Sequence, residues 1–300
     1  MQESSRDLLR SLVRCASRSS ALGSTPLSVS GISGALVTLS GAQGIRTLPS
    51  FSLEGKTCVE FPSACVDITK AAGEASIKHI AEHVAASQPS EPVPELKAYA
   101  CDVTQEAQVK ETFAQIVRDF GNVDVVATAA GIVDNVEAEN YEHPRWRRML
   151  NVNLDGTFLF AREAGKHMLE NRLRGSIILI GSMSGQICVR PQKQAAYNAS
   201  KGAVAMLAKS LATDHPYFRR WGPSGIRVNC LSPGYMETDL IRELLTKQGK
   251  ELVNSWIRDI PLGRMAHPSE MQGAAVWIAS DASSYLNGSD IIIDGGYTAY

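Results

Sequence analysis

One continuous apolar run limits what this chain can fold into. The segment Gly175-Ser-Ile-Ile-Leu-Ile-Gly181 is almost entirely apolar and stops at a cluster of small hydroxyl residues that includes Ser182 and Ser184. Strands of a parallel sheet are buried on both faces and therefore have this near-continuous apolar character. In such sheets, functional side chains gather at the carboxyl ends of the strands. The run predicts a central strand of a parallel sheet with a site directly after it.

Segments with strand character and segments with helix character alternate along the rest of the chain. Besides 175–181, strands are expected at residues 35–39, 64–68, 96–103, 123–127, 226–232 and 289–294. Helices are expected at residues 71–87, 105–120, 146–172, 237–249 and 267–280. Alternation of this kind indicates an α/β protein with a doubly wound, mostly parallel sheet. We expect a single domain over residues 31–300.

The composition is that of an ordinary globular protein. Hydrophobic residues make up 44% of the chain, which is enough to bury a sizeable core. The formal charge of −1 gives no basic surplus for nucleic acid or an anionic membrane. No apolar run approaches the ~20 residues that a transmembrane helix needs. The six cysteines are scattered, without a Cys-x-x-Cys pair, which indicates reduced thiols. We therefore expect a cytoplasmic protein with a small-molecule partner, and neither nucleic acid nor membrane.

The first thirty residues differ from the rest. Arginines recur every four residues from Arg6 to Arg18, between leucines and serines, a composition typical of a mitochondrial transit peptide. Glu3 and Asp7 argue against that interpretation. The simpler interpretation is a disordered or weakly helical extension. We expect residues 1–30 to lie outside the fold, with a mitochondrial location as the alternative to a cytoplasmic one.

A tyrosine and a lysine follow the apolar run at a spacing that suits proton transfer. Tyr197 and Lys201 are four residues apart, so on a helix they share one face. A neighbouring cation favours the phenolate, so it could lower a phenol pKa of about 10. The tyrosine would then exchange protons at neutral pH. The alternative is a surface tyrosine packed on a lysine stem, because Tyr-x-x-x-Lys occurs by chance in many helices.

Several motifs occur in an order that is typical of one family. They are Cys101-Asp-Val103, Ala129-Ala-Gly131, Asn151-Val-Asn153, Ser182, the Tyr197 and Lys201 pair, and Pro233-Gly-Tyr-Met-Glu-Thr238. With these motifs the chain resembles the short-chain dehydrogenase/reductase family from about residue 32 to its end. The resemblance implies a Rossmann fold with a seven-stranded sheet, a nicotinamide cofactor, and a homo-oligomer, either a dimer or a tetramer.

The resemblance also assigns a catalytic tetrad. Its members are Asn153, Ser182, Tyr197 and Lys201. Ser182 would hydrogen-bond the reacting oxygen of the substrate, with Ser184 as the fallback. Tyr197 would exchange the proton, while Lys201 would lower the pKa of Tyr197 and hold the nicotinamide ribose. Asn153 would hold a water that links the lysine to solvent, although an asparagine can also bend or cap a helix locally.

A second set of residues is expected to bind the cofactor, NAD or NADP. Besides Tyr197 and Lys201 they are Gly41, Gly44, Ile45, Asp67, Ile68, Asp102, Val103, Ala130, Gly131, Pro233, Gly234, Met236 and Thr238. A carboxylate at the end of the second strand accepts hydrogen bonds from the adenosine ribose and repels a 2′-phosphate. Asp67 therefore favours NAD over NADP. Alternatively or in addition, Asp67 could cap the helix that follows.

The glycine-rich turn that should bind the pyrophosphate departs from the family pattern Thr-Gly-x-x-x-Gly-x-Gly. Only Thr38, Gly41 and Gly44 can be matched, one residue out of step, and Arg46 stands where the last glycine belongs. Prolines and glycine between residues 47 and 63 also break the helix and strand expected there. Either the fold is rearranged locally or the gene was misread. The alternative to an enzyme is therefore a cofactor-impaired relative that acts as an oligomeric or interaction protein.

Three segments resemble the fungal sugar-alcohol branch of the family, which includes sorbose reductases, mannitol dehydrogenases, arabinitol dehydrogenases and xylulose reductases. They are residues 181–185, 221–235 and 280–289. The resemblance implies an oxidoreductase that transfers hydride between a nicotinamide cofactor and a carbonyl or secondary alcohol, with a polyol or ketose as the first expectation. His79 and His83 match the zinc-peptidase pattern His-x-x-Glu-His, but no downstream glutamate motif accompanies them, so we expect no metal.

Overall fold

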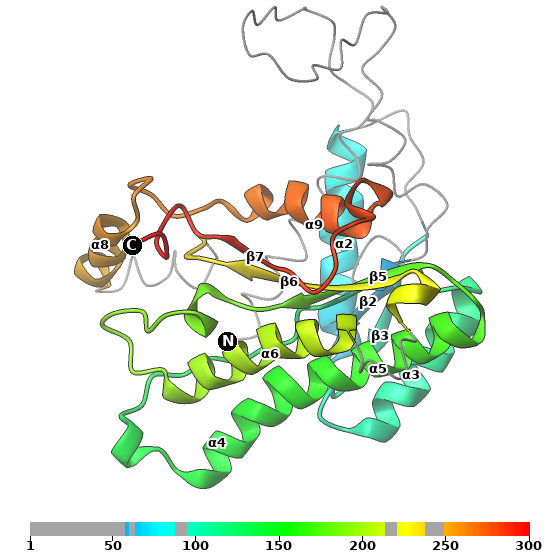
Figure 1. Ribbon diagram of the computed structural model, residues 1–300, viewed down its shortest axis with the longest axis horizontal. Coiled ribbons are helices and arrows are strands. Elements are labelled where there is room, and N and C mark those ends of the chain that lie inside the picture. The colour runs from blue at the N-terminus through cyan, green and yellow to red at the C-terminus, as the bar shows by residue number, and fades with distance from the viewer. Residues whose placement is uncertain (1–57, 60–63, 88–94, 214–220, 238–248) are drawn as a thin grey trace, which may run out of the picture.

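A seven-stranded parallel sheet organises the described part of the chain. The computed structural model describes residues 58–59, 64–87, 95–213, 221–237 and 249–300 (Figure 1). Within these ranges the strand order is β3-β2-β1-β4-β5-β6-β7, with every pair parallel. The strands are β1 Cys58–Val59, β2 Ala64–Asp67, β3 Lys97–Ala100, β4 Val125–Thr128, β5 Gly175–Ile180, β6 Ile226–Pro233 and β7 Asp290–Ile293. The order reverses between β1 and β4, so the sheet is doubly wound and the predicted Rossmann fold is confirmed.

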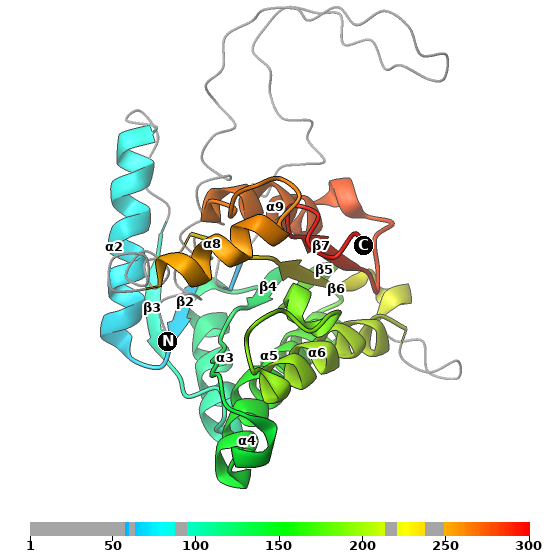
Figure 2. The same cartoon turned by 90° about the vertical axis from the view of Figure 1, so that its left-hand side faces the viewer.

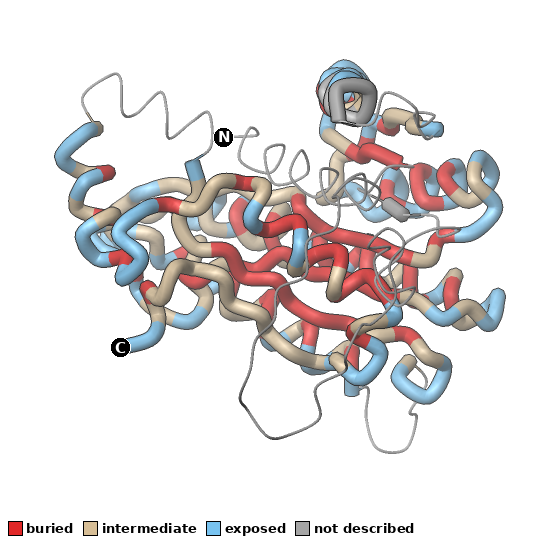
Figure 3. The backbone as a smooth tube through the Cα atoms, turned by 90° about the horizontal axis from the view of Figure 1, so that it is seen from above, coloured by how far each residue is buried: buried red, intermediate tan, exposed pale blue. Residues whose placement is uncertain are grey.

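Helices cover both faces of this sheet. They are α2 Lys70–Ser87, α3 Glu106–Phe120, α4 His143–Leu150, α5 Gly156–Glu170, α6 Ala195–Thr213, α8 Lys250–Asp259 and α9 Gln272–Ala279. Figures 1 and 2 show α3, α5 and α6 on one face and α9 on the other. Figure 3, seen from above, shows buried segments running through the centre of the molecule and exposed segments at its margins. The two faces form separate apolar clusters, one with α3, α5 and α6 and the other with α9.

The apolar spacing of α3 explains which of its faces is buried. Val109, Phe113 and Ile116 follow one another at intervals of four and three residues, and all three are buried. This period places them on one face of the helix, against the sheet. Burying one such side chain contributes roughly 1.5–3 kcal/mol. The prediction of a helix with a core-facing stripe at 105–120 is thereby confirmed.

The helix expected over residues 146–172 is divided into three segments. A π-helical turn, Asn151–Asp155, lies between α4 and α5, and the backbone N–H of Gly156 donates to the carbonyl of Asn151. A π turn widens the helix by one residue and is frequent at functional sites. The widening places Asn153 in the interior of the protein, where it is fully buried.

The sheet position expected for residues 35–39 is occupied by another segment. Strand β1 lies between β2 and β4, with Val59 beside Ala64 and Val126. Residues 35–39 themselves lie outside the described residues, whereas the prediction of the second strand is confirmed by β2. Only residues 60–63 connect β1 to β2, although a parallel crossover normally needs a dozen residues or more. The expected glycine turn at 41–46 precedes β1, so it cannot form the β1–β2 connection.

The remaining differences concern shorter segments. Residues 267–280 form a 3-10 turn, Pro268–Met271, followed by α9. Helix α8 was not predicted, although Val253, Trp256 and Ile260 recur on its buried side. The boundary at residue 30 and most of the helix expected at 237–249 lie outside the described residues. Among the helices of the described ranges, none is long and apolar enough to cross a membrane.

Candidate active site

The structure brings Ser182, Tyr197 and Lys201 together at the carboxyl end of β5. Ser182 directly follows Gly181, the first residue after β5, and its hydroxyl lies close enough to the phenol of Tyr197 to lower the pKa of that phenol. Helix α6 carries the other two side chains on one face, and Lys201 Nζ lies 5.9 Å from the centroid of the Tyr197 ring. The lysine also donates a hydrogen bond of 2.7 Å to the carbonyl of Ile180, the last residue of β5. The strand and the helix thus converge on one site.

Burial dominates the electrostatics of this site. Lys201 is only 5% exposed, and burial lowers the pKa of its ammonium to about 8, an effect opposed by nearby Cys230. Burial also raises the pKa of Tyr197, while the contact with Ser182 opposes that rise. Low polarity disfavours the charged form of both groups. That Lys201 lowers the pKa of Tyr197 stays a prediction; the ammonium is itself desolvated and donates a hydrogen bond to Ile180. Ser182 is the neighbour that favours the phenolate.

Asn153 connects the loop after β4 to α6. Its Oδ1 accepts a hydrogen bond of 2.8 Å from the backbone N–H of Ile132, and its Nδ2 donates to the Ile132 carbonyl at 2.9 Å. Nδ2 also donates to Ser200 Oγ at 3.0 Å. Ser200 in turn donates to the carbonyl of Tyr197 at 2.7 Å. The side chain thus fixes the backbone around Tyr197, and its expected role in holding a water stays a prediction.

The second hydroxyl of the cluster has a different position. Ser184 is buried, and its backbone N–H donates to Ser182 Oγ at 3.1 Å. Ser182 therefore faces Tyr197, while Ser184 orients Ser182 through its main chain. This geometry favours Ser182 over the fallback Ser184 as the residue that meets the substrate oxygen.

The residues expected around the nicotinamide border the buried lysine. A Cβ on Gly131 would lie 3.6 Å from Asn153 Oδ1 and 3.7 Å from Lys201 Nζ, so the glycine leaves the lysine open on that side. Ala130 precedes this glycine in the same loop. Small residues beside a buried ammonium fit a nicotinamide ribose. Among the partners expected there, Thr238 lies outside the described residues.

The loop after β6 is held in place by a second segment. Pro233 and Gly234 lead to Tyr235 and Met236, where Glu237 N donates to the Ala266 carbonyl at 2.9 Å and Ala266 N donates to the Tyr235 carbonyl at 3.0 Å. Met236 and Ala266 form a parallel β-bridge. The predicted cofactor residue Met236 therefore has a fixed backbone.

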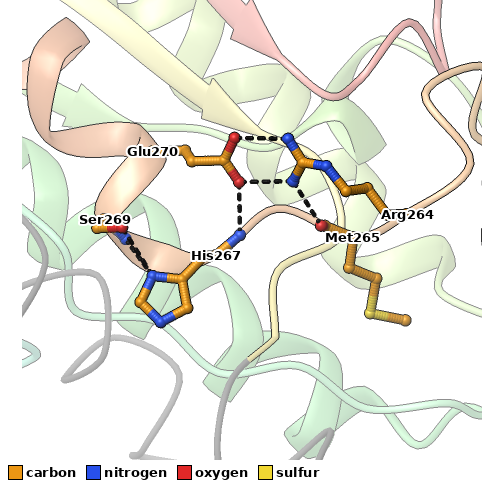
Figure 4. A network of polar contacts seen from close by, with 5 residues as sticks. All are labelled: Arg264, Met265, His267, Ser269 and Glu270. Carbon is orange, nitrogen blue, oxygen red and sulfur yellow. Dashed lines mark hydrogen bonds and ion pairs between the residues drawn. The ribbon is translucent and has the colours of Figure 1, made fainter.

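An ion pair next to Ala266 fixes that second segment (Figure 4). Arg264 donates two hydrogen bonds, of 2.7 and 2.8 Å, to the carboxylate of Glu270. The same carboxylate accepts from the backbone N–H of His267 at 2.8 Å, which forms part of a capping box. These bonds lower the pKa of Glu270 to about 2. Sequence analysis did not find this pair, although Arg264 and Glu270 are only six residues apart.

The residues expected at the adenosine end lie at the carboxyl ends of β2 and β3. Asp67 ends β2, and its Oδ1 accepts from Ile68 N at 2.7 Å. Asp102 accepts from the backbone N–H and the hydroxyl of Thr104, and Val103 follows it in the same turn. The side chain of Thr69 accepts from Ala72 N at 3.2 Å, so this threonine performs the capping role considered for Asp67.

The remaining residues singled out from the sequence, or their side chains, lie outside the described part of the structure. Gly41, Gly44 and Ile45 lie outside the described residues, as do the side chains of His79 and His83. In the part of the chain that the structure describes, no group of three His, Cys, Asp or Glu side chains is arranged to hold a metal ion.

Comparison with known proteins identifies the family. A family model described as enoyl-(acyl carrier protein) reductase matches residues 63–298. The chain belongs to the short-chain dehydrogenase/reductase family, as the motifs predicted. The family match begins just before β2 and leaves out β1, which is the part that departs from the expected pattern.

Individual relatives agree with the predicted branch. An NADH-dependent L-xylulose reductase of Ambrosiozyma monospora is 37% identical over 69% of this chain and 75% of its own length. An NADP-dependent mannitol dehydrogenase of Alternaria alternata is 41% identical over 67% of this chain and 71% of its own. These relatives confirm the resemblance to the sugar-alcohol branch. They support an enzyme and give no support to the alternative of a cofactor-impaired interaction protein.

Solved structures agree as well. A short-chain type dehydrogenase/reductase from Mycobacterium marinum has a TM-score of 0.73 at 32% identity, covering 84% of this chain and 98% of that chain. A gluconate 5-dehydrogenase from Burkholderia cenocepacia J2315, in complex with NADP and tartrate, has a TM-score of 0.71 at 27% identity, covering 84% and 98% of the two chains.

Proposed function

We propose that this protein is an NAD(P)-dependent oxidoreductase that transfers a hydride between a nicotinamide cofactor and the carbonyl or secondary alcohol of a polyol or ketose. The observation that carries the proposal is the contact of Ser182 with Tyr197 beside the buried Lys201. The names of the relatives, an L-xylulose reductase and a mannitol dehydrogenase among them, support the substrate class. The fold supports a ligand at the carboxyl ends of the strands.

Each side chain of the site has a separate task in this reaction. When bound, the nicotinamide supplies or accepts the hydride. Tyr197 Oη gives a proton to the substrate oxygen in reduction and takes it back in oxidation. Ser182 Oγ binds the same oxygen and keeps the phenol oriented. Lys201, an ammonium below a pH of about 8, binds the nicotinamide ribose and supplies a positive charge beside the reacting oxygen.

The choice between the two cofactors depends on Asp67. Its carboxylate lies at the end of β2, where it would accept hydrogen bonds from the ribose hydroxyls and repel a 2′-phosphate. We therefore expect NADH to bind more tightly than NADPH. The relatives include enzymes named for each cofactor.

We also infer that the protein forms a homo-oligomer, either a dimer or a tetramer. Phe158 on α5 and Met206 on α6 are 38% and 59% exposed, and an interface formed by these two helices would bury both side chains. Tyr300 at the chain end is also exposed, whereas Tyr297 packs against Tyr235 inside the subunit. Light scattering coupled to size exclusion tests this inference, and a monomer at micromolar concentration would contradict it.

Cofactor titration is the decisive test of the proposed function. Titration with NADH and NADPH, followed by the fluorescence of the reduced nicotinamide, should show saturable binding of NADH at micromolar to millimolar concentration. Addition of a ketose such as L-xylulose should then oxidise the bound NADH. Because only residues 60–63 connect β1 to β2, this measurement matters more here than for a chain with the usual glycine turn. Failure to bind either cofactor would overturn the proposal.

A further inference from the structure

The carboxylate of Asp290 connects two segments at the edge of the site. Asp290 is the first residue of β7, and its Oδ1 accepts a hydrogen bond of 2.5 Å from Ser232 Oγ near the end of β6. Its Oδ2 accepts a hydrogen bond of 2.7 Å from Gln186 Nε2. A carboxylate makes stronger hydrogen bonds than a neutral acceptor does. The residue therefore joins the end of the central sheet to the segment that follows β5.

Gln186 closes the short turn that orients Ser182. The turn is the 3-10 segment Met183–Gly185, in which Gly185 N donates to the Ser182 carbonyl and Gln186 N donates to the Met183 carbonyl, both at 2.9 Å. Ser184 N donates to Ser182 Oγ at 3.1 Å. The direction of the Ser182 hydroxyl is thus set by the same few bonds that close the turn.

Two glycines allow this turn to pack closely against β6 and α6. A Cβ on Gly181 would lie 2.4 Å from Ser232 Oγ and 2.6 Å from Cys230 Sγ, so the residue before the turn packs tightly against β6. A Cβ on Gly185 would lie 2.7 Å from the carbonyl carbon of Lys201, so its far side lies directly on α6. Gln186 lies at the exposed end of the turn, where its hydrogen bond to Asp290 holds that end in place.

We propose that Asp290 is a positioning residue for the hydride-transfer reaction: through Gln186 and Ser232 it holds the turn at the angle at which Ser182 meets Tyr197. The inference rests on the proposed function, since it concerns the residue that binds the reacting oxygen. It assigns a task in the reaction to a side chain that does not touch the tetrad itself.

The pH dependence of the reaction distinguishes positioning from simple support of the fold. The contact with Ser182 lowers the pKa of Tyr197, in opposition to burial. If the turn moves, that contact weakens, so the pKa of Tyr197 rises. In alcohol oxidation the phenolate is the base, so the midpoint of the rate against pH should then move to higher pH. A substitution that only loosens the fold would not move this midpoint.

The test uses exposed Gln186, whose replacement leaves the core intact. Gln186→Met removes the donor to Asp290 and should lower kcat about tenfold, with an unchanged KM for the cofactor and a midpoint at higher pH. Gln186→Lys restores a donor and should keep wild-type kcat. Gln115→Met, the same change at an exposed glutamine on α3, is the matched control and should change nothing. Asp290→Leu removes both bonds and should give a larger loss of kcat, with thermal unfolding measured to show that it folds.

Hydrogen exchange separates this proposal from the proposed function. In Gln186→Met the amides of residues 182–187 should exchange at least several-fold faster than in the wild type and in Gln186→Lys. Wild-type kcat and an unmoved midpoint in Gln186→Met would overturn the positioning role. If the wild type itself shows no turnover, the proposed function fails. The amide exchange rates of residues 182–187 then test the positioning role: faster exchange in Gln186→Met supports the contribution of the Gln186–Asp290 bond, and equal rates overturn it.

Discussion

The two halves of the sheet differ in how completely they form a site. On one side, β5 and β6 pair over six consecutive residues, Gly175–Ile180 with Ile226–Leu231. Ser182 follows the end of β5, and β6 ends at Pro233. On the other side, β1 pairs only through Cys58 and Val59 and is joined to β2 by residues 60–63 alone. The first half holds the groups that move the proton. The second half carries the residues expected to bind the adenosine end of the cofactor. Proton chemistry and dinucleotide binding therefore depend on separate regions and can be tested separately.

The strongest test of this separation is Tyr197→Phe. The change removes the proton-transfer group and should reduce kcat roughly 10³-fold. Binding of NADH, measured by fluorescence titration, should weaken far less than kcat falls, because Tyr197 is only one of the expected cofactor contacts and the adenosine end is held by the other half. Circular dichroism checks that the variant folds. Retained turnover would show that Tyr197 is not the acid and base of the reaction.

A pair of serine variants separates the two hydroxyls of the cluster. Ser182→Ala should lower kcat about 100-fold, because a fixed hydrogen bond to the reacting oxygen is lost. It should also move the pH midpoint of alcohol oxidation upward, since the contact that lowers the pKa of Tyr197 is removed. Ser184→Ala is the matched control, because Ser184 orients Ser182 through its backbone N–H, which alanine retains. A larger loss from Ser184→Ala would reverse the assignment.

Asp67→Ala tests the opposite half. Removal of a carboxylate that accepts hydrogen bonds from the ribose should weaken NADH binding roughly 10- to 100-fold, since such bonds to a charged group contribute roughly 1.5–3 kcal/mol. Binding of NADPH should become stronger as the repulsion of its 2′-phosphate disappears. The midpoint of the alcohol-oxidation rate against pH, measured at saturating cofactor, should not move. If NADH and NADPH bind as before, the adenosine end does not lie at β2.

The smallest expected effect concerns the junction between α5 and β4. His167 Nε2 accepts a hydrogen bond of 3.3 Å from the backbone N–H of Val123, and burial lowers the pKa of His167 below its usual value. The lowered pKa contributes to the free energy of unfolding, and this contribution is complete at pH values above the unfolded pKa of about 6.5. The stability falls as the pH drops below that value and levels off once the folded histidine is protonated.

Urea unfolding measured between pH 7.5 and pH 4.5 checks the expectation. His167→Gln retains an acceptor for Val123 without a titrating ring, so it should lose part of the pH dependence that the wild type shows in this range. An identical pH dependence in the two proteins would exclude His167 as its source.

The sequence allowed the active-site half to be predicted because its signals are local. The apolar run that became β5 and the spacing of Tyr197 and Lys201 each lie within one element, so periodicity is sufficient to find them. Strand β1 has two residues and no period, and it is recognised only by its neighbours in the sheet. The π turn depends on the bonds of Asn153 to Ile132, which lie 21 residues away in the sequence. The bond between Gln186 and Asp290 spans 104 residues and leaves no local pattern.

The pKa of Tyr197 shows that a motif predicts which residues lie together but not how buried they are. The spacing places Lys201 beside the phenol, as predicted, but spacing does not report how much water reaches either group. Burial disfavours charge on both side chains, and it is the largest cause of the pKa shift of each.

The π turn at Asn151–Asp155 makes the number of residues in this region as important as their identity. A π turn contains one more residue than an α turn, so it is equivalent to a single-residue insertion in a continuous helix. Deleting any one of these residues would allow α4 and α5 to join as one regular helix. Because the π turn takes up the extra residue locally, α4 and α5 would keep the faces that they now present to the core. Met149 would stay buried, but the widening that places Asn153 in the interior would be lost, and with it the bonds of Asn153 to Ile132. A length change that is tolerated in most surface helices would here dismantle the tetrad.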